Sequence, residues 1–320
     1  MFGHRTSARA AGILVGYLAD QAFGDPRRFH PVAGFGTSAA ALERLTHGDS
    51  RAAGALHTGV LVTVVGATSV LAARAARGPW AEAAMMAAAT WVALGGKSLA
   101  RTGAELADLL AADDIDGARA LLPSLCGRDP AYLDRDGLAR AALESIAENT
   151  SDAQVAPLMW AAVAGIPGVL GYRAINTLDA MVGHRSPRYA RFGWAAARLD
   201  DVVNYVGARV GGALVVVCAP LVGGSPRGAF RAWWRDAAKH PSPNAGVVEA
   251  SFAGALGVRL GGPTQYRHEL QIRPTLGEGR APGVDDLRRS VVLSEVVQLA
   301  SALVAVSVAG RSGRRACPRR

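Results

Sequence analysis

The sequence is poor in charged and aromatic residues and contains few cysteines. Of its 320 residues, 19% are charged and 6% are aromatic, whereas 50% are hydrophobic. Soluble globular domains carry about 25% charged residues, so a water-soluble enzyme is disfavoured, and the apolar content excludes a disordered chain. The cysteines lie far apart in no C-x-x-C spacing, at Cys126, Cys218 and Cys317. This excludes a disulfide framework and gives no basis for a cysteine zinc site.

Motifs of the common soluble enzyme classes are also missing. The sequence has no G-x-S-x-G nucleophile elbow, and its histidines form no pair at the four-residue spacing of helical metal ligands. The stretch Gly96-Lys97-Ser98 matches only the end of a phosphate-binding loop, because the first glycine of that pattern falls on Trp91. Any nucleotide site in this chain is therefore expected to be of another kind.

The charge is unbalanced towards basic residues. Lysine and arginine together number 35 and aspartate and glutamate 26, which gives a net charge of +9. The sequence has no basic stripe interleaved with aromatic residues and no DNA-binding motif, so we expect no nucleic-acid partner. Contact with anionic lipid at a bilayer surface explains the excess more simply.

Long uncharged runs are the main feature that the sequence does have. Residues 52–73 form a run of 22 uncharged residues, and a spanning helix needs about 20. Pro157 and Pro167 interrupt the run 153–172, which predicts a broken or re-entrant segment. We predict an all-α, polytopic integral membrane protein with helical extramembrane lobes. A single membrane-embedded catalytic domain, 1–310, would precede a basic disordered tail, 311–320. It would hold about four to six membrane segments, near 11–23, 52–73, 80–96, 153–172, 202–226 and 290–310.

The first stretch able to carry chemistry is 24–32. Its two prolines prevent a continued helix and force an extended turn. Asp25, Arg28 and His30 lie on this turn. They are candidates for contact with a phosphate or a metal; an N-terminal turn with solvated charges is the equal alternative.

The second stretch, 144–152, is acidic. On a helix, Glu144, Glu148 and Asp152 share one face, and three carboxylates there without a neighbouring lysine or arginine repel one another. A cation is expected to bind these three carboxylates, and Mg²⁺ is the natural candidate because it prefers hard oxygen ligands. An acidic helix face in water is the alternative.

Three more polar stretches flank apolar runs. Arg173, Asn176, Asp179 and Arg185 directly follow one run, and Arg198, Asp200 and Asp201 precede another. Paired acids at a membrane entry are costly unless they are solvated or bind a cation, although Arg198 can instead pair with Asp201. The turn 239–246 is stiffened by two prolines and contains Asn244; it can cradle a phosphate or be a plain loop.

These stretches carry a resemblance to a known family. The chain resembles the membrane-bound cobinamide-phosphate synthases of cobalamin biosynthesis. The similar segments are GDPRRFHPVAGFG (24–36), GRDP (127–130), ESIAENTSDAQVAPLMW (144–160), the long segment 172–205, HPSPNAGVVEASFAGALGVRLGG (240–262) and RPTLG (273–277). Ala153 departs from the glycine usual at that position of the family.

The resemblance implies an ATP-dependent amide ligase. The family joins (R)-1-amino-2-propanol or its O-phosphate to the free propionate carboxylate of adenosylcobyric acid, giving adenosylcobinamide or its phosphate. A free carboxylate does not condense with an amine unaided, so ATP would activate it, with Mg²⁺ neutralising phosphate charge. The implied setting is the lipid bilayer of the cell membrane, in several passes, with the site facing the cytoplasm and other cobalamin nucleotide-loop enzymes as further partners.

Residue roles follow as hypotheses from the resemblance and the chemistry together. Glu144, Glu148 and Asp152 would bind Mg²⁺ or take the proton of the amine. A second metal site would be formed by Asp179, Asp200 and Asp201, and phosphate oxygens would be held by Arg173, Arg185 and Arg198. Substrate amides would be oriented by Asn149, Asn176 and Asn244. The first loop would close the site with Asp25, Arg28 and His30. The rival interpretations are a permease that uses intramembrane carboxylates to couple cations or protons, and a membrane phosphotransferase acting on an activated lipid.

Overall fold

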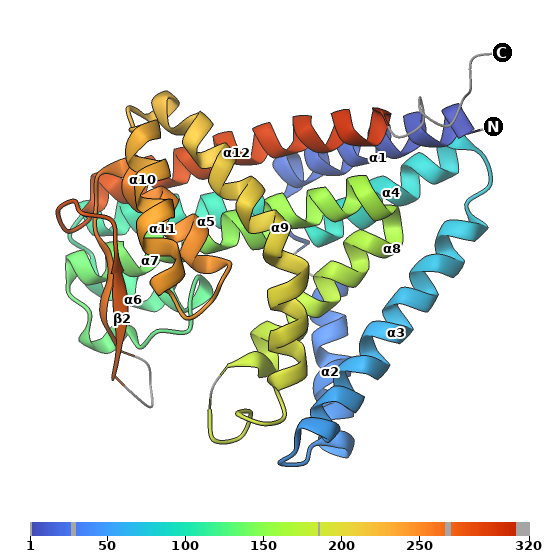
Figure 1. Cartoon of the computed structure of the whole chain (residues 1–320), viewed down its shortest axis with the longest axis horizontal. Coiled ribbons are helices and arrows are strands. Elements are labelled where there is room, and N and C mark those ends of the chain that lie inside the picture. The colour runs from blue at the N-terminus through green and yellow to red at the C-terminus, as the bar shows by residue number, and fades with distance from the viewer. Residues whose placement is uncertain (1, 27–29, 185, 266–269, 312–320) are drawn as a thin grey trace. The chain divides into compact units, whose positions relative to one another are not determined.

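The structure, a computed structural model, describes residues 2–26, 30–184, 186–265 and 270–311. It is mostly α-helical, as predicted (Figure 1). The helices are α1 (Phe2–Phe23), α2 (Pro31–Thr46), α3 (Arg51–Ala75), α4 (Pro79–Ala93), α5 (Gly96–Ala111), α6 (Ile115–Leu121), α7 (Arg135–Thr150), α8 (Ala156–Leu178), α9 (Trp194–Cys218), α10 (Pro226–Asp236), α11 (Ala245–Leu256) and α12 (Val284–Arg311). An antiparallel hairpin of β1 (Leu260–Gln265) and β2 (Leu270–Leu276), absent from the all-α prediction, is added to them.

The chain divides into two compact units, and each is assembled from separate stretches of sequence. Unit 1 comprises residues 1–95, 156–204 and 301–320, and unit 2 comprises residues 96–155 and 205–300. The boundaries fall within α9 and α12, so both helices contribute to both units. That the whole of 1–310 acts as one catalytic domain stays a prediction.

Four helical stretches of the described residues are long and apolar enough to cross a membrane: Arg51–Ala75, Arg135–Gly183, Trp194–Val222 and Val284–Arg311. They overlap the uncharged runs near 52–73, 153–172, 202–226 and 290–310. On α3, large apolar side chains such as Leu56 and Leu71 remain more than 60% exposed, as expected for a helix that faces lipid. The other two predicted segments lie in α1 and α4, which are apolar but are not among the four.

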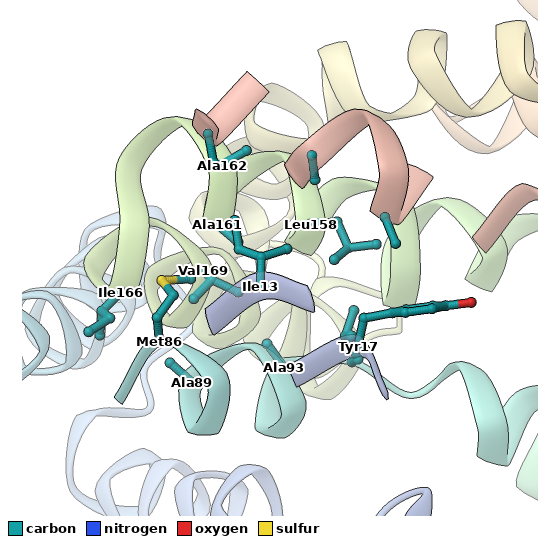
Figure 2. Close-up of a cluster of buried hydrophobic side chains, with 14 residues drawn as sticks. Ile13, Tyr17, Met86, Ala89, Ala93, Leu158, Ala161, Ala162, Ile166 and Val169 are labelled. Atoms are coloured by element: carbon teal, nitrogen blue, oxygen red, sulfur yellow. The ribbon is translucent and has the colours of Figure 1, made fainter. Parts of the chain in front are cut away.

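Unit 1 has a core of small and apolar side chains (Figure 2). Ile13 and Tyr17 of α1 meet Met86 of α4 and Leu158 of α8. Gly12 and Gly16 let α1 approach α4 closely: a Cβ atom at either position would lie within 2.6 Å of an α4 atom. Small residues four positions apart commonly pack helices in membranes.

Helix α8 is broken, as its prolines predict, and Figure 1 shows it changing direction. The break lies at Gly165, whose φ of 65° and ψ of −148° are accessible essentially only to glycine. Pro167 follows and has no N–H to donate. Arg9 Nη1 donates to the carbonyl oxygens of Ala162 and Val163, at 3.3 and 3.4 Å, where the helix breaks.

Unit 2 packs α5 and α11 against α7 and adds the hairpin beside α11. The hairpin is held by the side chain of Asp236, 1% exposed, at the end of α10. Asp236 accepts hydrogen bonds from Arg235, from Lys239 Nζ at 2.8 Å and from Gly277 N–H at 2.9 Å. Burial opposes its charge, but these donors hold the pKa of Asp236 well below its usual range.

Candidate functional site

The candidate residues gather in two groups, one in each unit. In unit 2, a glutamate–arginine cluster consists of Arg128, Glu144, Glu148, His240, Glu249 and Arg273. In unit 1, an amide–aspartate network consists of Tyr172, Arg173, Asn176, Asp200 and Asn204. We describe each by itself.

Glu144 is the anchor of the glutamate–arginine cluster and is 2% exposed. Its Oε2 accepts a hydrogen bond from Arg128 and lies 3.6 Å from Arg273 Nη1. Its Oε1 accepts the Gly261 N–H at 2.7 Å. Gly261 lies in a bulge of β1 with φ of 81°, a conformation that favours glycine. Both oxygens of Glu144 are therefore satisfied, by two guanidinium groups and one backbone N–H.

A second set of contacts links the hairpin to α11 within the cluster. Arg273 of β2 contacts His240 Nε2 and lies 3.4 Å from Glu249 Oε1, while His240 Nε2 lies 3.6 Å from the same oxygen. His240 Nδ1 accepts the Ser242 N–H at 3.0 Å and lies 3.1 Å from the Ser242 carbonyl oxygen. Glu249 is 1% exposed and is held by one guanidinium rather than two.

Glu148 differs from both of these carboxylates. It lies one turn after Glu144 on α7, is half-buried, and accepts no hydrogen bond from any described residue. Neighbouring Asn149 donates back to the Ser145 carbonyl at 2.9 Å. The α-helix ends at Thr150, and a π-helical turn covers Ser151–Val155. The α-helical spacing that would place Asp152 on the same face as the two glutamates therefore does not extend to Asp152.

Burial and charge set the protonation of the cluster outside α7. Burial disfavours the charge of Arg128, but the adjacent Glu144 carboxylate outweighs this and raises the pKa of the guanidinium. Burial raises the pKa of Glu249 to about 8, although Arg273 opposes the shift. Burial and the Arg273 charge lower the pKa of His240 to about 4, so the imidazole is neutral at pH 7.

The amide–aspartate network of unit 1 is a chain of hydrogen bonds. Tyr172 Oη donates to Asn204 Oδ1 at 2.7 Å, and Asn204 Nδ2 donates to Asp200 Oδ2 at 2.9 Å. Asn176 Nδ2 donates to Asp200 Oδ1 at 3.3 Å and accepts from Arg173 Nη1 at 3.5 Å. The predicted proximity of Arg173, Asn176 and Asp200 is thus observed, with both oxygens of Asp200 engaged by amides.

Arg173 also borders a cavity of about 170 Å³ in unit 1. Its Nε is buried without a hydrogen-bond partner among the described residues. Apolar side chains from α2, α3 and α8 form most of the remaining wall, including Val32, Phe35, Val65 and Leu170. A guanidinium at the edge of an apolar cavity suits an anion with an apolar body.

The remaining acidic candidates of unit 1 have local partners. Asp201 pairs with Arg198, with 3.4 Å between Oδ2 and Nη1, which is the ion pair considered as the simple alternative. Asp179 lies in a π-helical turn and packs against Gly183, where a Cβ atom would overlap its carboxylate.

The first loop is partly described. His30 caps α2 by accepting the Val32 N–H on Nδ1 at 3.1 Å, and its Nε2 lies 3.4 Å from Asp25 Oδ1. This pair orders the start of α2. Arg28 and Arg185 lie outside the described residues, so their predicted phosphate contacts stay predictions.

Asn244 lies in unit 2 and is 5% exposed. Its Oδ1 accepts a hydrogen bond from Arg209 Nη1 at 2.8 Å, and the same guanidinium stacks on the Tyr205 ring, 3.6 Å from its centroid. The turn predicted to cradle phosphate therefore presents an arginine beside its asparagine.

The described residues contain no group of three or more histidine, cysteine, aspartate or glutamate side chains arranged to hold a metal ion. To bind Mg²⁺, Glu144 would lose a guanidinium or the Gly261 N–H, and Asp200 would lose an amide donor. These two carboxylates do not fit a metal-ligand role as they stand. The metal assignments of Asp179 and Asp201 stay predictions.

Sequence reasoning missed four members of the cluster as site residues: Arg128, His240, Glu249 and Arg273. None of them belongs to a local pattern of charge. All four fall inside the segments GRDP, HPSPNAGVVEAS and RPTLG, which carry the family resemblance, and His240 also lies in the turn 239–246.

Comparison with known proteins extends over nearly the whole chain. Residues 13–294 match the family model described as CobD/Cbib protein. A protein of Mycobacterium tuberculosis named cobalamin biosynthesis protein CobD is 66% identical over 311 residues, which are 97% of this chain and 99% of that protein. Proteins of the same name from Geobacter metallireducens and Stutzerimonas stutzeri are 41% and 43% identical over 85% and 84% of this chain, and over 87% and 88% of their own lengths. No solved structure matches the chain.

Proposed function

Because the chain belongs to the CobD/Cbib family of cobalamin biosynthesis proteins, we propose that it is an ATP-dependent amide ligase. It joins an amino group to the free propionate carboxylate of adenosylcobyric acid. The amine is (R)-1-amino-2-propanol or its O-phosphate, and the product is adenosylcobinamide or its phosphate.

The glutamate–arginine cluster is the observation that carries this proposal. Amide formation from a carboxylate needs charge of both signs at one place: cations for carboxylate and phosphoryl oxygens, and an anion for the incoming ammonium. Arg128 and Arg273 supply the cations, and Glu148 supplies a carboxylate that no described donor occupies. A free carboxylate does not condense with an amine in water unaided, so activation by ATP accounts for the chemistry best.

ATP enters this proposal as a second substrate that phosphorylates the propionate. Mg²⁺ would accompany its phosphates, as it usually does with few protein carboxylates; we route no step through a protein-bound metal. Arg173, beside its apolar-walled cavity, and the exposed Arg198 remain our candidates for phosphate oxygens, with Arg185 as the third.

We place the reaction on the cytoplasmic side of the cell membrane, since ATP is available there. The four candidate spans support a multi-pass location, and an association with other enzymes of the pathway is compatible with it. The apolar plane and the amide-rich edges of a corrinoid suit a site at a bilayer rim.

A ligation assay on the full chain, purified in detergent, tests the proposal. It contains adenosylcobyric acid, Mg-ATP and either aminopropanol or its phosphate, and the corrinoid product is detected by mass. A product that gains the mass of the amine less water is expected, and the preferred amine settles the substrate.

The matched variants are Glu148→Gln in the cluster and Glu105→Gln on the exposed face of α5. The first should abolish ligation and the second should not. The ligase proposal is contradicted if folded wild-type protein makes no product with either amine while a control enzyme is active. The permease interpretation would then remain, and it is tested by measuring corrinoid or cation flux into vesicles.

A further inference from the structure

Helix α10 exposes aromatic and basic side chains on one face. Trp234 is 82% exposed and Phe230, one turn earlier, is 54% exposed, and their rings stack with 6.3 Å between centroids. The exposed Arg227 and Arg231 precede Phe230 and Trp234 by three positions each, so all four lie on this face. Neither arginine has an ion pair with another described residue, whereas Arg235 of the same helix pairs with two carboxylates. This face therefore offers two rings and two cations to a partner outside the chain.

The opposite face of α10 is fixed against α11 within unit 2. A Cβ atom on either Gly228 or Gly254 would overlap the carbonyl oxygen of the other glycine. Ala232, whose side chain lies close to Gly254, is 4% exposed. Because only small residues allow two helices to approach this closely, α10 cannot rotate to bury its rings. The aromatic and basic face is therefore a permanent surface of unit 2.

The ends of two candidate membrane spans meet where α10 begins. One span, which includes α9, ends at Val222, and the other begins at Val284 with α12. Arg289, near the start of α12, donates hydrogen bonds to the carbonyl oxygens of Val222 and Gly223, both at 3.2 Å. A guanidinium is costly in the hydrocarbon layer, so this contact marks the level at which the two spans leave it. The connection from Val222 to Pro226, the first residue of α10, reaches at most about 14 Å, so α10 begins beside the lipid headgroups.

We propose that α10 is an interfacial helix whose exposed face binds anionic phospholipids at the bilayer surface. Phe230 and Trp234 insert between the lipids, and Arg227 and Arg231 contact their phosphates. Tryptophan is enriched at membrane–water interfaces, and a helix that combines such rings with basic residues lies in the plane of the interface. The guanidinium fork matches the phosphate oxygens in geometry and charge. A bilayer surface is therefore the partner that satisfies the rings and the arginines together.

The test places a fluorescent dye on this face of the full chain. The dye NBD is attached to Trp234→Cys after the three native cysteines have been replaced by alanine, and the protein is reconstituted in phosphatidylcholine vesicles that contain phosphatidylglycerol. The control carries the dye at Asp116→Cys, on an exposed side chain of α6 in the same unit. Two quenchers are compared, which are iodide in the water and a nitroxide attached to the lipid near its headgroup.

We expect the lipid nitroxide to quench the dye at position 234 and iodide to quench it weakly, with the reverse result at position 116. Nitroxide-labelled phosphatidylglycerol should be favoured over labelled phosphatidylcholine at position 234 by about fivefold for each arginine.

The double variant Arg227→Gln/Arg231→Gln separates the arginines from the rings. It should lose the preference for phosphatidylglycerol while the dye stays in contact with lipid. The matched control Arg101→Gln/Arg135→Gln removes two exposed arginines from α5 and α7 of the same unit, and it should keep the preference.

The other results overturn the proposal in different ways. Iodide quenching at position 234 that equals the quenching at position 116 means that water covers this face. Protection from both quenchers means that protein covers it, either a second copy of the chain or another partner. Equal quenching by the two labelled lipids in the wild-type background, or a preference that survives in Arg227→Gln/Arg231→Gln, means that the arginines do not bind the phosphates.

Discussion

Two buried acids, one in each unit, are held in different ways. Glu144 in unit 2 is 2% exposed and is held by two guanidiniums and a backbone N–H. Asp200 in unit 1 is 9% exposed, and both of its oxygens accept hydrogen bonds from amide side chains. Cations stabilise a carboxylate more strongly than neutral donors do, but they bring charge that a ligand can also use. The cluster around Glu144 is therefore suited to chemistry, whereas the network around Asp200 is suited to holding helices together.

The largest effect is expected when Glu144 loses its main cation. Arg128→Gln leaves a buried carboxylate undercompensated, which typically costs about 3–5 kcal/mol. The measurement is the free energy of unfolding in detergent. In the control Arg288→Gln, the variant loses only an exposed ion pair with Asp108, which is worth about 1 kcal/mol or less. Equal losses in the two variants would show that Glu144 does not depend on its guanidinium.

A smaller loss is expected in the network of unit 1. Asp200→Ala removes the acceptor of Asn176 and of the fully buried Asn204. Each stranded donor costs about 1–3 kcal/mol, and relaxation reduces the total to about 2–3 kcal/mol. Asp49→Ala, which removes an exposed partner of Arg191 in the same unit, should change the unfolding free energy by less than about 1 kcal/mol. If the two alanine variants are equally stable, the hydrogen-bond chain carries no stability.

The third test concerns the break in α8 and compares alanine substitutions at two glycines of that helix. Gly165→Ala forces alanine into a conformation that only glycine adopts readily, at a cost of about 1–3 kcal/mol. Gly171→Ala in the same helix meets no atom within 4 Å and should stabilise by about 0.5–1 kcal/mol, because alanine is the better helix former. Opposite signs in thermal unfolding confirm that the break in α8 is built into its backbone; a shared sign contradicts it.

Much of the fold follows from local features of the sequence. Uncharged runs between charged residues predict the apolar helices, because such helices need about 20 apolar residues in a row. The break in α8 is signalled by Pro157 and Pro167, although it lies at Gly165, two residues before Pro167. The hairpin was not predicted because LGGPTQ in β1 has no alternation of apolar and polar residues.

The candidate site was predictable only in part. Helical spacing places Glu144 and Glu148 on one face, but the π-helical turn at Ser151–Val155 ends that spacing. The partners of Glu144 come from far along the chain: Arg128 is 16 residues away and Gly261 is 117 residues away. No periodicity reveals such pairs, and Glu249, in an otherwise apolar helix, looks like an isolated charge until the fold brings Arg273 to it.

The smallest expected effect is the pH dependence that Glu249 gives to the free energy of unfolding. Its pKa is about 8 in the folded chain against 4.5 ordinarily, so its stabilisation is complete below pH 4.5 and is lost as the pH rises through 8. His240, with a pKa of about 4 against 6.5 ordinarily, acts oppositely, but only between pH 4 and 6.5. From pH 6.5 to 8, the wild-type unfolding free energy should therefore fall by about 1.6 kcal/mol on account of Glu249. Glu249→Gln should flatten this fall, and His240→Asn should not. An unchanged slope in Glu249→Gln would mean that Glu249 does not titrate between pH 6.5 and 8.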